Sequence, residues 1–466
     1  AWGWGSDQFW GWVNIRNLPG ELLGNGGLFP QYSNWWWHST RVIDTIRDGK
    51  SLDFTITEFP FFSFLLGDLH AHVMSLPFLL LNLSLILNLF LCRDRFGLRW
   101  LRDHPFESLM LSFSLGSLAF INFWDIPVMA ACLTVILFVS AFRHGCDRPY
   151  TAIRSTISMI LPIFSIAILM FVPFHLGLEG QVSGVLPLQD VSTRPFFFIL
   201  IWGPFLAIAL LILMKQGWSL PRQRSEFRSG VLLIITLVCF PMLLWAIWIS
   251  ISIWSYEELS SILSVVLSRF IKVAPLMALV GFALYSAIIR VKEGLIGLAF
   301  CLSLIALGFF LLIGVELFYV EDFLPLRMNT VFKVYYQVWL LLALACSFGI
   351  YYWFSQQLSP TILPRLFRST SGLLCSMLVV AMFYYPLGAT LDRINNSDSH
   401  PTLDGLAFIK KVSIGEYDAI SRLRDHAVKG RIVEAVGEDY SEYGRISAST
   451  GLPSLLNWPG HELQWR

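Results

Sequence analysis

Apolar runs of membrane-spanning length constrain this 466-residue sequence more than any other feature. A helix needs about 20 mostly apolar residues to cross the hydrocarbon core of a bilayer. Hydrophobic residues make up 55% of the chain and charged residues only 14%, with a mean hydropathy of +0.63. We therefore expect an all-α polytopic membrane protein with about ten transmembrane helices. Their centres lie in Ser75–Leu91, Phe106–Phe123, Pro127–Phe142, Ile153–Phe174, Phe196–Met214, Val231–Ile253, Val273–Ile289, Leu295–Gly314, Val334–Phe354 and Leu373–Leu387.

The loops between these runs differ in charge. One alternate set holds most of the Lys and Arg residues, and the positive-inside rule places that set in the cytoplasm. The other loops then lie outside the plasma membrane. We expect an extracytoplasmic loop with an interfacial helix in residues 1–72, a transmembrane domain in 73–390, and an extracytoplasmic α/β segment in 391–466. A net charge of +1 with scattered arginines excludes a nucleic-acid-binding protein, so the expected surroundings are membrane lipids.

The segment EFPFFSFLLGDLHAHVMSL places ionisable residues where the chain enters the membrane. Pro60 and Gly67 predict a short interfacial helix over 60–66 followed by a break. If the helix resumes at Asp68, then Asp68 and His72 share one face and, with His70, can act as a general base or bind Mg²⁺ or Mn²⁺. Alternatively, Asp68 caps the helix and the histidines lie among lipid headgroups.

Two further acids near the membrane have both functional and structural interpretations. Glu58 is a second candidate catalytic residue, but a carboxylate before Pro60 also stabilises a helix entrance. Asp125 is a candidate substrate-binding residue, and as an N-cap of the following helix it would have a purely structural role.

A second group of polar residues lies in ELFYVEDFLPLRMNTVFKVYYQ, residues 316–337. Asn329, Lys333 and Gln337 recur every fourth residue, which predicts a polar stripe along one helix face. With Arg327, Lys333 would form a phosphate site at the helix N-terminus. Alternatively, both cations reach lipid headgroups and Tyr336 belongs to an aromatic belt. Arg194 is a third candidate cation with the same alternative.

The polar tail predicts a helix near residues 417–428 and a strand in residues 432–436. Its last residues, GLPSLLNWPGHELQWR, combine aromatic rings with polar planar groups. His461 and Glu462 would contact a sugar there, although such a loop can also lack a function.

Four segments resemble those of the YYY-type polytopic membrane protein family, which has no known function. They are ITEFPFFSFLLGDLHAHVMSLPF, FINFWDIP, ELFYVEDFLPLRMNTVFKVYYQVWLLLALA and ISASTGLPSLLNWPGHELQWR. Val334 stands where the family's name suggests a third aromatic residue. This family resembles, in its architecture, the C-type glycosyltransferase (GT-C) superfamily, whose members take sugars from polyprenyl-phosphate lipids outside the membrane.

The resemblance implies a glycosyltransferase that moves a sugar from a polyprenyl-phosphate donor to an unidentified acceptor. Asp68 or Glu58 would activate the acceptor, and the two histidines would orient it or bind a divalent cation. Arg327 and Lys333 would hold the departing lipid phosphate. Two alternatives remain open, a transporter or flippase for an anionic lipid or solute, and a non-catalytic assembly subunit.

Overall fold

The computed structural model divides the chain into two compact units, Ala1–Ala389 and Thr390–Arg466, and each is described by itself. The residues that the structure describes are 29, 34–47, 50–92, 94–144, 149–178, 182–219, 228–254, 258–324, 326–355, 361–395, 402–426 and 430–465.

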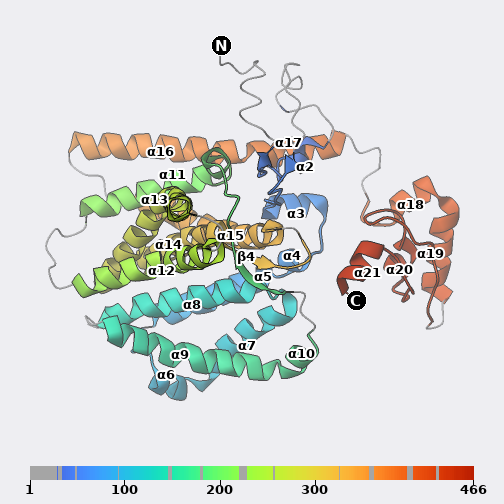
Figure 1. The fold of residues 1–466 in the computed structure, drawn as a ribbon. Helices are drawn as coiled ribbons and strands as arrows, with labels where there is room; N and C mark the ends of the chain where they lie inside the picture. The colour runs from blue at the N-terminus through green and yellow to red at the C-terminus, as the bar shows by residue number, and fades with distance from the viewer. Residues whose placement is uncertain are drawn as a thin grey trace, which may run out of the picture. The chain divides into compact units, whose positions relative to one another are not determined.

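The first unit is a bundle of helices with two short strand pairs (Figure 1). Its elements are α2 (Trp35–His38), β1 (Ile46–Arg47), β2 (Lys50–Ser51), α3 (Pro60–Leu66), α4 (Ala71–Met74), α5 (Leu76–Leu91), α6 (Leu98–Asp103), α7 (Pro105–Ile121), α8 (Asp125–Ala141), α9 (Pro149–Met170), α10 (Val172–Leu176), β3 (Gly184–Pro187), α11 (Pro195–Ser219), α12 (Arg228–Ile253), α13 (Leu259–Lys292), α14 (Ile296–Leu317), β4 (Phe318–Glu321), α15 (Met328–Ser355), α16 (Ile362–Met382) and α17 (Tyr384–Asn395).

Within the described residues, seven helical segments are long and apolar enough to cross a membrane. They correspond to α9, α11, α12, α13, α14, α15, and the stretch formed by α16 and α17. The other three expected spans are the shorter apolar helices α5, α7 and α8, of 16, 17 and 17 residues. All ten predicted centres therefore lie in apolar helices, but the structure supports seven spans by length.

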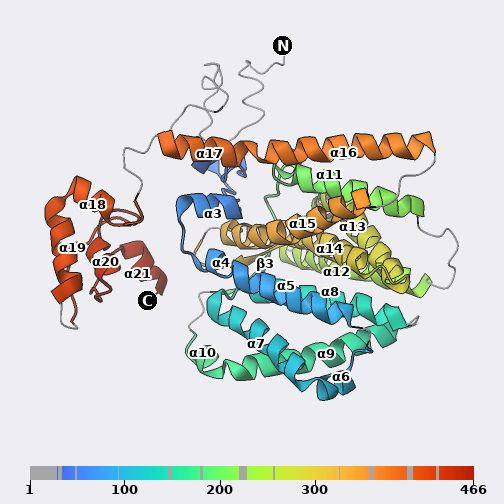
Figure 2. The same cartoon turned by 180° about the vertical axis from the view of Figure 1, so that it is seen from behind.

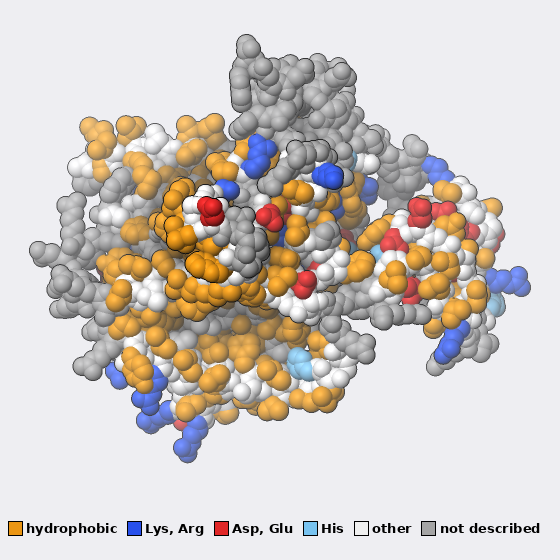
Figure 3. Space-filling view, in the orientation of Figure 1, with side chains coloured by type: hydrophobic (Ala, Val, Ile, Leu, Met, Phe, Trp, Pro, Cys, Tyr) orange, Lys and Arg blue, Asp and Glu red, His pale blue; other side chains and the backbone are white. Residues whose placement is uncertain are grey.

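Helix α14 lies in the middle of the bundle and has the most buried sequence of the long helices. It packs against α13 and α15, while α5, α7, α8 and α9 form a group on one side (Figures 1 and 2). Helices α11 and α16 pack together on the opposite side. Large apolar side chains cover much of the outer surface, as Figure 3 shows, which is the pattern expected of helices that face lipid.

A strand pair joins two distant loops at one end of the bundle. Strand β3 pairs antiparallel with β4, with Gly184 opposite Glu321 and Pro187 opposite Phe318. The β1–β2 pair is equally short, with Ile46 opposite Ser51. The β3–β4 pairing brings the segment after α10 next to the segment after α14, close to the start of α15.

In its described residues, the second unit contains the helices α18 (Ala407–Val412), α19 (Ile414–His426), α20 (Arg445–Thr450) and α21 (Pro459–Trp465), and no strand. The expected helix near residue 417 is α19, but the strand predicted in residues 432–436 is wrong. Ile432 makes only an isolated bridge to Ser454, and Glu434 instead accepts hydrogen bonds from the backbone of Ile446 and Ser447 at the start of α20. The Glu434 side chain therefore caps α20, and residues 432–436 do not form the hydrogen bonds of a strand.

Candidate functional site

The chain breaks between α3 and α4 as the sequence predicts, but it resumes later than expected. Helix α3 ends at Leu66 and is followed by Gly67, whose φ of 74° is a left-handed conformation that glycine adopts without a steric penalty. The expectation that the helix resumes at Asp68 is wrong, because α4 begins at Ala71. The Asp68 carboxylate accepts a hydrogen bond from the His70 backbone N–H at 3.1 Å, which holds this turn outside the helix.

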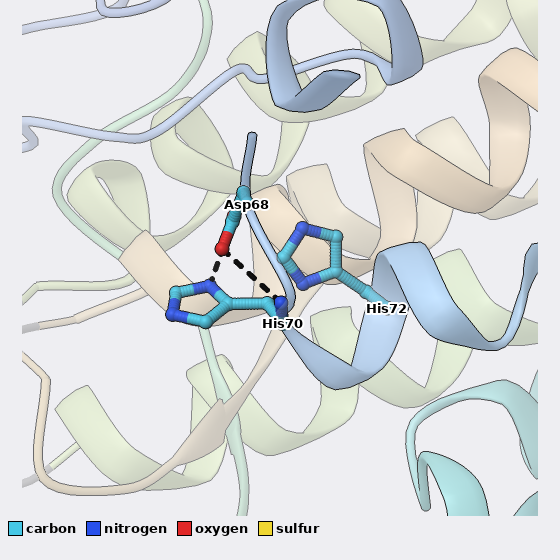
Figure 4. Close-up of side chains that lie close together, drawn as sticks. All are labelled: Asp68, His70 and His72. Carbon is cyan, nitrogen blue, oxygen red and sulfur yellow. Dashed lines mark hydrogen bonds and ion pairs between the residues drawn. The ribbon is translucent and has the colours of Figure 1, made fainter. Parts of the chain in front are cut away.

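Even so, the turn brings Asp68, His70 and His72 together (Figure 4). One potential ligand atom from each side chain lies within 4.8 Å of the other two. The His70 Nδ1 atom lies 3.2 Å from the Asp68 Oδ2 atom. The His70 side chain is 65% exposed and that of Asp68 only 12%, whereas His72 is buried. The cluster therefore extends from the surface into the interior.

His72 is packed against the start of α15. Its ring contacts the rings of Phe332 and Tyr336 edge-on, each with centroids 4.7 Å apart. The Lys333 Nζ atom lies 3.3 Å from the His72 Nδ1 atom. Burial, reinforced by the positive charge of Lys333, lowers the pKa of His72 from 6.5 to about 3. The imidazole is therefore neutral at physiological pH.

The predicted polar stripe on α15 is present, and each member reaches a different element. Asn329 donates a hydrogen bond of 2.6 Å to Asp322, in the loop after β4. Lys333 meets His72 on α4, and Gln337 donates to Asp125 on α8. The stripe therefore faces the protein interior and contacts three separate segments. We call the stripe and the residues that it contacts, together with Asp68 and His70, the polar region.

Asp125 belongs to this polar region and does not cap its helix. Trp124 holds the N-cap position of α8, and Asp125 is completely buried. Its carboxylate accepts hydrogen bonds from the side-chain amides of Asn122, at 2.8 Å, and Gln337. The capping interpretation is therefore wrong, because the side chain points to α15 and not to the first turn of its own helix.

Arg327 lies apart from this region, in a buried ion cluster. Its guanidinium donates to Asp53 at 2.6 Å and to Glu316 at 2.8 Å, and also to Thr193 and the Val315 carbonyl oxygen. Burial alone would lower the pKa of Arg327, but the two carboxylates raise it above its ordinary value. All five N–H donors of a guanidinium are occupied here, counting the Nε bond to Asp53.

The expectation that Arg327 binds a phosphate together with Lys333 is therefore wrong. Arg327 has no exposed surface and no donor to spare for a phosphate. Arg194, the third expected cation, is half-buried beside this cluster, with its guanidinium carbon 5.0 Å from the Phe197 ring centroid. Sequence reasoning missed Asp53, because no local pattern marks an aspartate that pairs with an arginine 274 residues away.

Glu58 forms the other buried ion pair of this end. Its carboxylate lies 2.5 Å from the Arg41 guanidinium, which in turn stacks over the Trp37 ring at 3.8 Å. Burial raises the pKa of Glu58, and the Arg41 charge offsets part of that effect. The pair joins the segment before α3 to the loop after α2, so the geometry favours a positioning role for Glu58.

An apolar cavity of about 870 Å³ is lined in part by α15, the helix that carries the polar stripe. Helices α11, α15, α16 and α17 line it, and Phe59 and Phe61 close it on the side of α3. Phe59 packs against Trp339 of α15 with centroids 5.2 Å apart. Trp339 follows the polar stripe on the same helix, so α15 carries both the polar stripe and part of the cavity wall.

In the second unit, His461 and Glu462 lie on α21. The His461 ring packs against the rings of Tyr440 and Trp458, each with centroids 5.2 Å apart. Its Nδ1 atom lies 3.8 Å from the Asp439 carboxylate. Tyr440 is 81% exposed and has a left-handed φ of 60°. Trp458 and His461 of the last segment therefore form a surface cluster with Tyr440 and Asp439, which lie before that segment.

Comparison with known sequences gives one match. Residues 5–342 match the family described as uncharacterized membrane protein (DUF2298). A search of curated proteins and a search of solved structures each gave no match. Because the match covers well over half of the chain, this protein belongs to the uncharacterized membrane protein family DUF2298.

Proposed function

We propose that this protein is a membrane glycosyltransferase that transfers a sugar from a polyprenyl-phosphate donor to an acceptor on the extracytoplasmic side of the plasma membrane. The observation that supports it best is that α15 carries both the polar stripe and, from Trp339 onward, part of the wall of the apolar cavity. A substrate with a long apolar chain and a polar head needs these two environments next to each other.

The cavity suits the isoprenoid chain of such a donor. Its walls are mostly apolar and aromatic, and they include Phe205 of α11, Ala343 of α15 and Met382 of α16. These helices are candidate membrane spans, so a lipid can approach from the hydrocarbon core without crossing a polar layer. The donor phosphate would then lie toward α3 and the start of α15.

The polar region supplies the groups for the transfer step. Asp68 would accept the proton of the acceptor hydroxyl, with His70 holding the carboxylate in place. Lys333 would attract the phosphate, and Asn329 and Gln337 would position it or the sugar. With Arg327 engaged elsewhere, Lys333 is the cation that this arrangement assigns to the phosphate.

The proposal includes ten membrane spans. At about 1.5 Å of rise per residue, α5, α7 and α8 reach roughly 24–26 Å, close to the thickness of a bilayer core. Helix α4 directly precedes α5 and extends it. With ten spans, the turn at Asp68 and the loop before α15 lie on the same side of the membrane, which the shared site requires.

Purified protein in nanodiscs, supplied with a polyprenyl-phosphate sugar donor and a panel of glycan acceptors, tests the proposal. We expect a transfer product from the native chain and a loss of at least about 100-fold in rate for Asp68→Asn, which removes the general base. Asp103→Asn serves as the control, because that carboxylate is exposed on α6. Full activity of Asp68→Asn would refute the assigned role, and solute counterflow without any transfer product would assign transport instead.

A further inference from the structure

We propose that Asp68, His70 and His72 bind a divalent transition-metal ion, and that the Lys333 ammonium takes the place of this ion at His72 when the ion is absent. The inference concerns the site of the proposed function. It rests on that function for the role of the ion and not for its binding.

The donor set determines which metals fit. One carboxylate and two imidazoles, with ligand atoms within 4.8 Å of one another, can all reach a single ion. Such a mixed nitrogen and oxygen set suits Mn²⁺, Fe²⁺, Co²⁺ or Zn²⁺. Mg²⁺ prefers oxygen ligands, so the two imidazoles argue against it.

His72 provides the second observation. Its side chain is 1% exposed, and its Nε2 atom has no hydrogen-bond partner among the described residues. A buried ring nitrogen without a partner is unfavourable unless a ligand engages the imidazole. The Asp68 carboxylate is already oriented beside it through its bond from the His70 backbone.

The charges around the site also favour a bound cation. The carboxylates of Glu58, Asp68, Asp125 and Asp322 all attract the Lys333 ammonium. Arg41 neutralises Glu58, and Asp125 is completely buried between two side-chain amides, so Asp68 and Asp322 remain against one lysine. This negative excess would repel a phosphate. A bound divalent cation would cancel the excess and allow an anionic donor to approach.

Lys333 and the metal compete for the same imidazole. The Lys333 Nζ atom lies 3.3 Å from the Nδ1 atom of His72, so a metal on Nδ1 would displace the ammonium directly. A metal on Nε2 would require a proton on Nδ1, and two donors would then face each other. The ammonium must therefore leave His72 in either case. Once released, it is free to meet the phosphate of the donor.

The test measures Mn²⁺ binding to the 466-residue chain in detergent micelles after removal of metals with a chelator. Electron paramagnetic resonance of free Mn²⁺ gives the affinity, and elemental analysis gives the stoichiometry. We expect one Mn²⁺ per chain in the native protein. His70→Ala, at an exposed position that folding tolerates, should weaken binding by roughly 10–100-fold.

Lys333→Met should instead strengthen Mn²⁺ binding by about tenfold, because it removes the competing positive charge. His175→Ala on α10 is the control and should leave the affinity unchanged. Absence of Mn²⁺ binding by the native chain would overturn the proposal, as would equal affinity in His70→Ala. An unchanged or weaker affinity in Lys333→Met would overturn the competition.

The same samples separate this inference from the proposed function. Specific Mn²⁺ binding without any sugar transfer would support the metal site and reject the glycosyltransferase. Sugar transfer at full rate by metal-free protein would overturn the role of the ion in the transfer and leave the glycosyltransferase standing.

Discussion

Replacing Arg327 with methionine should severely destabilise the end of the bundle at which α15 begins. The side chain is fully buried, and its five donors serve Asp53, Glu316, Thr193 and the Val315 carbonyl oxygen. Methionine fills much of the same volume but supplies no charge. The two carboxylates, 2% and 8% exposed by residue, would remain buried without their cation.

The structure sets the magnitude of this effect. A hydrogen bond to a charged group contributes about 1.5–3 kcal/mol, and breaking a buried ion pair costs about 3–5 kcal/mol. Glu316 keeps its two bonds from Thr193, at 2.9 Å and 2.5 Å, so most of the loss falls on Asp53. We therefore expect Arg327→Met to lower the free energy of unfolding by about 3–5 kcal/mol.

Denaturant titration of the purified protein in mixed micelles, followed by tryptophan fluorescence, measures this loss. Adding Asp53→Asn to Arg327→Met should recover about 1–2 kcal/mol, because the uncompensated charge is then gone. Arg99→Met is the control, since that side chain is 94% exposed, and it should change stability by less than about 0.5 kcal/mol.

Native stability in Arg327→Met, combined with a lower affinity for a lipid phosphate, would refute this reasoning. It would restore the phosphate-binding role that the sequence suggested for Arg327. A double variant no more stable than Arg327→Met alone would show that the unpaired Asp53 charge is not the main term.

Two further predictions concern the segments beside the site. Gly67→Ala should lower the free energy of unfolding by about 1–2 kcal/mol in the same titration, because a residue with a Cβ is strained at φ 74° even though space surrounds it. Gly184→Ala is the control, since Gly184 also lies in open space but has no positive φ. Equal losses of stability in the two variants would contradict the backbone argument. Ala343→Trp should fill the cavity and slow sugar transfer from a long-chain polyprenyl donor about tenfold, with a smaller effect on a short-chain donor. Leu344→Trp, on the exposed face of the same helix, is the control and should leave both rates unchanged. Equal transfer rates in the two variants would show that the donor does not occupy the cavity.

Much of the fold follows from local pattern. Runs of about 20 apolar residues must form helices in a bilayer, because no other conformation satisfies their backbone groups there. Pro60 and Gly67 bound α3 as expected, because proline fits the first turn of a helix and glycine adopts the left-handed conformation that ends one. The strand expected in residues 432–436 failed because a short apolar run forms a strand only if a partner pairs with it, and Ile432 alone found one.

The site was predictable only in part. The four-residue spacing of Asn329, Lys333 and Gln337 determined that they share a face of α15. Spacing also suggested that Asp68 meets His72 through a helical turn. They do meet, but through a non-helical turn held by the Asp68 carboxylate. Local rules therefore identified the residues that meet but predicted the wrong backbone conformation for the segment that joins them.

The sequence did not predict which buried charged residues pair with one another. Arg327 and Lys333 look alike there, since both are cations near the entrance of the same helix. Tertiary packing separates them, because Arg327 turns to Asp53 and Glu316 while Lys333 turns to His72. Helical periodicity and hydropathy act within about 20 residues, so the sequence by itself determined the helices, their apolar faces and the stripe on α15. The pairing of buried charges depends on segments far apart in the chain, and only the tertiary structure decided which cation is neutralised and which faces the site.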